Sequence, residues 1–261
     1  MKLTLRRLRR ISLIINLKTV IISALSVFST YLCLKYGLQA DFPLTLIATS
    51  IVFPIVFSIS GAYKRRETAL AKYAALKAHG KAIYFAVRDW PEVQDEESLE
   101  KIKVLLGRLL TACRDLLTQP VAKIRDNEDI VYGVLSDMSG FIKTELRQKG
   151  LASGEVSRCN QYLSKILLAF EDVKHIYQYR TPRTLRAFSD FFITTLPVLY
   201  GPYFAHIATD FSPQFVYFMP VLFSVMFVAL DNIQNHLENP FDQIGEDDVS
   251  INAEEFVDRL K

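Results

Sequence analysis

Residues that could carry catalysis or bind a metal are few in this sequence, and they are scattered along it. The four histidines, His79, His175, His206 and His236, lack the spacing of a metal site, and no Ser/His/Asp or Cys/His set accompanies them. The three cysteines include no C-x-x-C pair and indicate ordinary buried thiols. No glycine-rich phosphate loop follows a strand pattern. The sequence therefore predicts no enzyme, no resident cofactor and no confident metal site.

Oxygen ligands are concentrated in the last 31 residues. Residues 231–261 contain nine acidic side chains against only Arg259 and Lys261. Amide and carboxylate oxygens are the ligands that calcium prefers, although the spacing here is not that of an EF-hand loop. A solvated acidic tail is the alternative interpretation, and it is the one favoured by this spacing. The oxygen-bearing residues of this weakly indicated calcium site are Asn239, Asp242, Glu246, Asp247 and Asp248.

Two phenylalanines and a threonine recur at four-residue spacing in the second apolar stretch. Thr49, Phe53 and Phe57 would lie on one face of a helix. From the residues alone, the simplest interpretation is that the rings pack against neighbouring helices. The alternative is that they face an opening and narrow it.

The elements that position these residues are long apolar windows closed by charged residues. Each window approaches the roughly 20 residues that a helix needs to cross a bilayer. The sequence therefore predicts an integral membrane protein of the all-α class, with the spans at the two ends of a 261-residue chain. Lys18, near the start of the first span, is expected to extend towards the headgroups. The four predicted spans are about 11–36, 42–63, 191–209 and 211–230.

The distribution of lysine and arginine predicts the orientation of the spans. Basic residues precede the first span, follow the second at 64–66 and precede the third at 180–186, whereas the connections at 37–43 and 206–213 have none. The positive-inside rule then places both termini and the middle of the chain in the cytoplasm. We expect the protein to lie in the plasma membrane, which in a bacterium is the inner membrane. The net charge of +3 and the lack of a basic stripe argue against nucleic acid as a partner.

The middle of the chain, about 64–185, has apolar residues at helical spacing and no strand alternation. The pattern predicts amphipathic helices that pack on each other or on other subunits. Asp89-Trp90-Pro91, Gln119-Pro120, Gly150–Gly154 and Thr181-Pro182 are the predicted helix ends. The four predicted helices cover about 67–87, 96–117, 128–148 and 156–179.

Three stretches together resemble the bestrophin channel family. Leu237-Glu238-Asn239-Pro240-Phe241 follows the last span, Phe57, Tyr63 and Arg65 lie where the second span ends, and the third span contains Leu196-Pro197 and Pro202. The order of spans and soluble helices is also similar over nearly the whole chain. Two features depart from the family pattern: Arg66-Glu67 stand where a tryptophan pair is usual, and the acidic run carries one extra residue.

The resemblance implies a single channel domain over residues 1–261 that assembles as a homopentamer in the lipid bilayer. Five copies of the second span would line the pore, with Thr49, Phe53 and Phe57 forming its hydrophobic neck. A second, weakly placed constriction is expected at Thr181, Pro182 and Arg183. Some bestrophins bind calcium at the acidic run, so the resemblance also implies a calcium site at the tail residues named above.

The function that we expect is passage of chloride or other small anions through this pore. The second span has no acidic residue that would form a cation-selecting ring. A cation-selective channel of the same family is one alternative, and a membrane-anchored interaction protein without conduction is another. A secondary transporter is a weaker alternative, because neither inverted repeats nor paired charges inside the spans are evident from the sequence.

Overall fold

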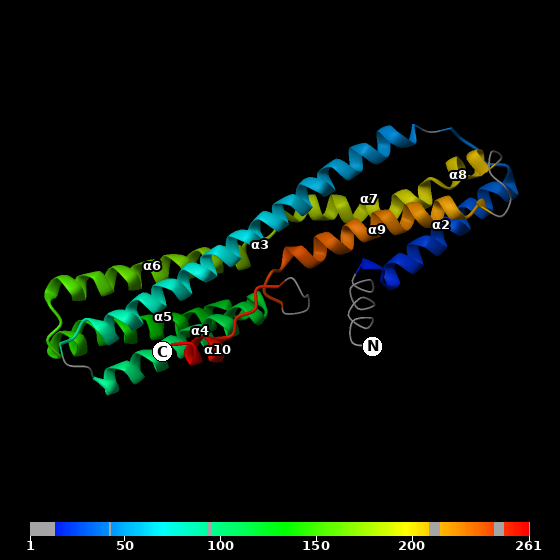
Figure 1. Cartoon of the computed structure of the whole chain (residues 1–261). Helices are drawn as coiled ribbons and strands as arrows, with labels where there is room; N and C mark the ends of the chain where they lie inside the picture. Colours follow the sequence, from blue (N-terminus) through cyan, green and yellow to red (C-terminus); the bar gives the residue numbers. More distant parts are fainter. Residues whose placement is uncertain (1–13, 42, 93–94, 209–214, 243–247, 261) are drawn as a thin grey trace. The chain divides into compact units, whose positions relative to one another are not determined.

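The computed structural model describes residues 14–41, 43–92, 95–208, 215–242 and 248–260, and in these ranges all regular structure is helical (Figure 1). This confirms the predicted all-α class. The chain forms two compact units. The first combines Met1–Lys64 with Thr181–Glu238, and the second combines Arg65–Arg180 with Asn239–Lys261.

The first unit contains the apolar helices. Its elements are α2 (Leu17–Tyr36), the beginning of α3 (Leu44–Asp89), α7 (Arg183–Leu199), α8 (Gly201–Ile207) and α9 (Phe218–Glu238). Asn16 caps the start of α2 by accepting a hydrogen bond from the backbone of Thr19, and Gly37 ends it with a φ of 67° that favours glycine. Helix α2 packs against α7, α8 and α9. The core of this unit includes Ile51, Ile55, Ile193, Phe227 and Val228.

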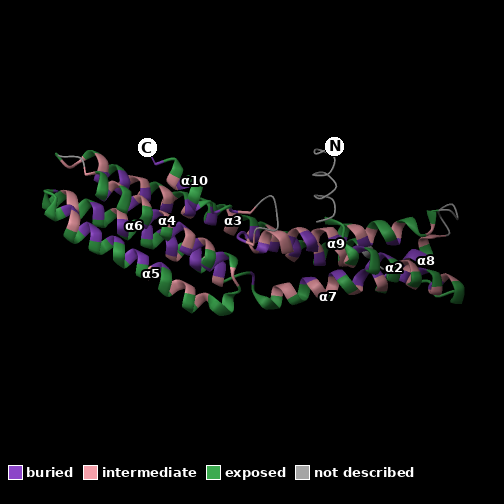
Figure 2. Ribbon diagram, turned by 90° about the horizontal axis from the view of Figure 1, so that it is seen from below, coloured by how far each residue is buried: buried purple, intermediate pink, exposed green. Residues whose placement is uncertain are grey.

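The second unit is a bundle of amphipathic helices. It contains the remainder of α3, α4 (Glu96–Thr118), a short 3-10 turn (Val121–Lys123), α5 (Ile124–Gly140), a π-helical turn (Phe141–Leu146), α6 (Ser153–Gln178) and α10 (Ala253–Asp258). Figure 2 shows buried residues along one side of α5 and exposed residues along the other. The leucines of α4 are at helical spacing and supply a large part of the core, which is what an amphipathic helix is expected to do.

Helix α3 differs from the sequence prediction because it is continuous. The second span and the helix predicted at 67–87 form one helix of 46 residues that includes Pro54. Nothing between them breaks the helix: Gly61 costs only about 1 kcal/mol relative to alanine, and basic residues favour helix. The predicted end is confirmed, since α3 stops at Asp89 before Trp90-Pro91.

The third and fourth predicted spans also differ from the structure. The window 191–209 is divided between α7 and α8, because Pro202 has no N–H with which to continue α7. Helix α9 begins at Phe218 and continues past the predicted limit of 230 to Glu238. Within the described residues, three helices have the length and hydropathy of a membrane span: Leu17–Tyr36, Thr45–Asp89 and Phe218–Glu238.

The prediction of a solvated tail is wrong for the part of residues 231–261 that the structure describes. Residues 231–238 form the last turns of α9, and α10 lies against α4. Apolar side chains alternate with the acidic ones in this segment, and they are buried in the core of the second unit. The buried side chains are Phe241, Val249, Ile251, Phe256 and Leu260.

Candidate functional site

The predicted neck residues share one exposed face of α3 in the first unit. Thr49 is exposed, and Phe53 and Phe57 retain 59% and 65% of their accessible surface. The two rings meet edge to face with their centroids 5.2 Å apart. Thr49, Phe53 and Phe57 therefore do share one face of the helix, as their spacing predicts. Both rings are left largely uncovered by the other described helices of the chain.

The opposite face of α3 explains this orientation. Ile51, Ile55, Ser58 and Ala62 recur at intervals of three and four residues and are all buried. They hold the helix against its unit, so the face one half-turn away must point outward. The exposed stripe continues to Ser60, and it therefore has hydroxyl groups on either side of its aromatic centre.

The predicted second constriction lies at the beginning of α7. Thr181 is buried, whereas Pro182 and Arg183 are exposed, and Pro182 makes no side-chain capping bond. The first turn of α7 has no acidic residue. A cation at a helix N-terminus is unfavourable with respect to the helix dipole, so Arg183 is not explained by the stability of α7.

The predicted calcium ligands are only partly within the described residues, because Glu246 and Asp247 lie outside them. Within those residues, no three His, Cys, Asp or Glu side chains gather as a metal site. The amide oxygen of Asn239 is buried and has no hydrogen-bond partner, while Asp242 and Asp248 take part in other interactions. The calcium site therefore stays a prediction, because two of its five residues lie outside the described part of the chain.

The first unit also contains a network of charged residues that was not predicted from the sequence. The ammonium of Lys18 on α2 lies 2.7 Å from the carboxylate of Asp231 on α9 and 3.7 Å from that of Asp190 on α7. Asp231 is 2% exposed. The expectation that no paired charges occur inside the spans is thus wrong for α9. The ammonium of Lys18 thus compensates the charge that Asp231 buries on α9.

A second ion pair joins α7 to the end of α9. Arg186 donates to the buried carboxylate of Glu238 at 2.7 Å and to the side-chain oxygen of Asn235 at 2.8 Å. In the sequence, Asp190 and Asp231 mark limits of apolar windows, but nothing there indicates which basic residue each would pair with. The pairing distinguishes Arg186, which stabilises helix packing, from exposed Arg183, which forms no ion pair with any described residue.

No family model and no curated protein sequence matches this chain. Solved structures do match it over nearly their whole length. A tryptophan-to-alanine variant of a bacterial bestrophin homolog from Klebsiella pneumoniae has a TM-score of 0.78 at 16% identity, covering 93% of this chain and 95% of that chain. Another structure of a bestrophin homolog from the same organism has a TM-score of 0.74 at 16% identity, covering 93% of each chain.

A third match, a membrane protein with a proline-to-alanine substitution, has a TM-score of 0.75 at 17% identity and covers 94% of this chain and 98% of that chain. The matches therefore define the class: this chain has the fold of the bestrophins. The resemblance inferred from the sequence motifs is confirmed at the level of the fold.

Proposed function

We propose that five copies of this chain form a membrane channel that conducts chloride or other small anions. The observation that carries the proposal is the exposed face of Thr49, Phe53 and Phe57 on a helix whose other face is buried. Two large aromatic rings exposed on one subunit need a covering surface, and copies of the same helix around an axis would supply it.

The composition of the stripe favours a pore over a surface that faces only lipid. A lipid-facing stripe gains nothing from hydroxyl groups, whereas this stripe has Thr49 before the two rings and Ser60 after them. Rings of hydroxyls on both sides of an aromatic constriction would leave it wetted at its ends and dry at its centre. Such a constriction can stop ions by dewetting.

Charge favours anions over cations. Residues 44–63 of α3 contain no acidic side chain that could concentrate cations in the neck. The edges of phenylalanine rings carry partial positive charge and can face a partly dehydrated anion. Exposed Arg183 would add a positive ring at the second constriction, with Thr181 and Pro182 shaping it.

The proposal extends to the assembly and its membrane. Both units would belong to one channel domain over residues 1–261, and both termini would face the cytoplasm of a bacterial inner membrane. The matches to bestrophin structures and the three apolar helices support this arrangement.

The test is ion flux from liposomes that contain the purified chain. Under a salt gradient, the reversal potential is expected to move towards the chloride equilibrium potential. The double substitution Phe53→Ala/Phe57→Ala should widen the neck and raise flux by about tenfold or more, because the barrier from dewetting falls with pore radius.

A matched control replaces exposed aromatic residues outside the stripe, as in Phe28→Ala/Tyr31→Ala on α2. This variant should leave the flux unchanged. A reversal potential near the cation equilibrium would make the chain a cation channel. No flux from either the native chain or the widened variant would refute conduction and favour an interaction protein.

A further inference from the structure

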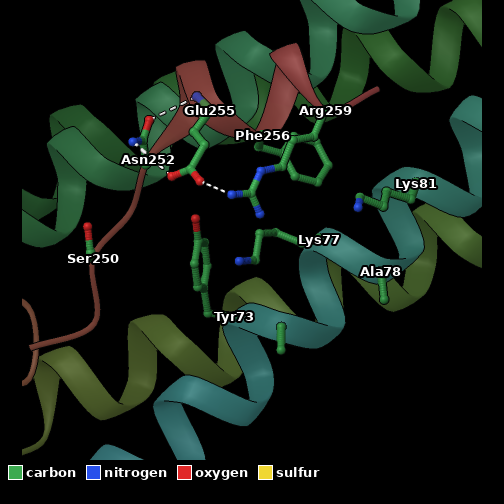
Figure 3. Close-up of a pocket in the computed structure, with 10 residues that line it drawn as sticks. Tyr73, Lys77, Ala78, Lys81, Ser250, Asn252, Glu255, Phe256 and Arg259 are labelled. Atoms are coloured by element: carbon green, nitrogen blue, oxygen red, sulfur yellow. Dashed lines mark hydrogen bonds and ion pairs between the residues drawn. The ribbon is translucent and has the colours of Figure 1, made fainter. Parts of the chain in front are cut away.

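The second unit contains a pocket that the proposed pore does not use. It lies between α3 and the segment that leads into α10, and its volume is about 390 Å³ (Figure 3). Pockets that hold small molecules measure roughly 300–1,000 Å³, so this one is of the size for a small solute. Its lining residues are Tyr73, Ala74, Lys77, Ala78, Lys81, Ser250, Asn252, Glu255, Phe256 and Arg259.

The charges that line the pocket are unbalanced. Lys77 and Lys81 extend from α3, and Arg259 directly follows α10, whereas Glu255 is the one acidic residue of the lining (Figure 3). Glu255 pairs with Arg259. Neither lysine has an ion-pair partner among the described residues, and each instead lies over an aromatic ring of the lining. Two positive charges are therefore left without compensation.

The pocket has a rigid frame. Asn252 caps α10 by accepting a hydrogen bond from the backbone of Glu255 at 2.9 Å, and its own amide donates to the Glu255 carboxylate at 3.2 Å. Phe256 is 6% exposed and packs above Gly80 of α3, where an added Cβ would lie 3.7 Å from its ring. These contacts hold α10 in place, so the cationic groups are positioned before any ligand arrives.

The polar groups around the cations suit an oxyanion. Burial raises the pKa of the Tyr73 hydroxyl to about 12, despite a backbone hydrogen bond from Asn252, so this group stays neutral and can donate. Ser250 adds a second hydroxyl to the lining. Ammonium, guanidinium and hydroxyl donors together bind tetrahedral oxyanions through charge-assisted hydrogen bonds. Ala74 and Ala78 also line the pocket and are exposed, so the pocket is open to solvent and a ligand can enter it.

We propose that this pocket binds the dianionic phosphate group of a small phosphorylated solute or of a phosphorylated lipid headgroup. A phosphate monoester carries between one and a half and two negative charges at about pH 7, which matches the two uncompensated charges of the pocket. The bound group would bridge α3 and α10 and hold the C-terminal segment down. This inference concerns binding and does not depend on whether the chain conducts.

The first experiment measures binding to the full chain in lipid nanodiscs by titration calorimetry at constant ionic strength. Inorganic phosphate and glycerol phosphate are expected to bind, and acetate is not. Lys77→Gln/Lys81→Gln should weaken phosphate binding by about tenfold or more, because it removes both uncompensated charges of the pocket. Lys143→Gln/Lys165→Gln removes the same charge from exposed positions outside the pocket and should leave the affinity unchanged.

Two further variants separate binding from folding. Ala78→Leu keeps every charge and fills the pocket, so phosphate affinity should fall. Glu255→Gln removes the one competing carboxylate, so affinity should rise about threefold or more by simple electrostatics. A gain of affinity cannot result from a misfolded chain. An unchanged affinity in both variants would overturn the proposal, as would equal weakening in the two double-lysine variants.

Varying the lipid composition of the nanodiscs distinguishes a lipid headgroup from a soluble ligand as the source of the phosphate group. Phosphatidic acid in the nanodisc should compete with glycerol phosphate if the natural ligand is a lipid headgroup. An unaltered affinity for glycerol phosphate assigns the pocket to a soluble ligand. In either case, binding should slow amide hydrogen exchange in residues 249–260, and faster or unchanged exchange would contradict the bridging of α3 and α10.

Discussion

A small group of charged and polar side chains joins α5 to α6 in the second unit. The ammonium of Lys174 donates to the hydroxyl of Tyr132 at 2.6 Å and lies 2.9 Å from a carboxylate oxygen of Glu171. The Tyr132 hydroxyl in turn donates to Glu171. Lys174 is 9% exposed, and Glu128 lies 3.4 Å from it. A cation buried to this extent is stable only because each of its neighbours is an acceptor.

Replacing Tyr132 by phenylalanine tests this group at the scale of one atom. The substitution removes the hydroxyl that connects Lys174 to Glu171, and the ion pairs of Lys174 remain. We expect the free energy of unfolding to fall by about 1.5–3 kcal/mol, the usual range for a hydrogen bond to a charged group. Denaturant unfolding of the full chain measures this change in the free energy of unfolding. Tyr179→Phe, at an exposed tyrosine, should have almost no effect; equal losses in both variants would contradict this account.

The same group predicts a dependence of stability on pH. Burial opposes ionisation of Glu171, but hydrogen bonds from Tyr132 and Lys174 outweigh it and lower the pKa of the carboxyl below its ordinary 4.5. A carboxyl with a lower pKa in the folded state stabilises the fold above the unfolded pKa, and this stabilisation is lost as pH falls through the folded value. The free energy of unfolding should therefore fall as the pH is lowered from about 5 to about 3. Glu171→Gln should make the curve of unfolding free energy against pH flatter in this range. Glu97→Gln, at an exposed residue of α4, should leave the curve unaltered.

At the scale of elements, Gly80 of α3 lies in close contact with α4 and in ordinary contact with α10. A Cβ at Gly80 would lie 3.0 Å from Leu106 and 3.7 Å from Phe256. Helix propensity alone predicts that Gly80→Leu stabilises α3 by about 1 kcal/mol. Overpacking of a close contact costs about 1–3 kcal/mol, and we expect this term to dominate.

The expected result for Gly80→Leu is faster amide hydrogen exchange in residues 249–260, by about tenfold. Gly133→Leu on α5 is the matched control, since nothing lies within 4 Å of a Cβ there and only the gain in propensity applies. It should leave exchange in the C-terminal segment unchanged. Slower exchange in Gly80→Leu would contradict this prediction, because it would show that Leu106 and Phe256 move aside at little cost.

The elements were predictable to the extent that their signals are local. Apolar periodicity and the proline-containing breaks predicted α4 and α6 and the end of α3, because each signal lies within a few residues of the feature. The continuity of α3 was missed, because the sequence has a change of polarity near residue 64 that was interpreted as a boundary. Polarity reports the surroundings of a helix, whereas only a break in its hydrogen bonding ends it.

The site shows the same limit. The shared face of Thr49, Phe53 and Phe57 follows from helical spacing and was predictable. The pairing of Lys18 with Asp231 was not, because the two residues are 213 positions apart and nothing local connects them. The burial of the tail was not predicted for a related reason. Nine acidic residues dominate its composition, whereas its packing depends on a few apolar residues that lie between them.

At the scale of the whole molecule, the native thiols make the pore testable. Cys33, Cys113 and Cys159 are free and buried. Burial raises the pKa of Cys113 to about 12 and that of Cys159 to about 11, so neither forms much of the reactive thiolate at neutral pH. A cysteine introduced into the proposed neck would therefore react much faster with a thiol reagent than these native cysteines.

Phe57→Cys is the decisive substitution for a symmetric pore. In a pentamer with α3 at its axis, five thiols would line one level of a narrow aqueous path. A charged, membrane-impermeant thiol reagent should then block ion flux almost completely, and oxidation should join neighbouring subunits by disulfides. The same treatment of Leu25→Cys, at an exposed apolar position of α2, should leave flux unchanged, because a charged reagent does not enter lipid. Equal modification at the two positions, or a chain that stays monomeric in detergent, would contradict the axial placement of α3, since one subunit alone cannot enclose a pore.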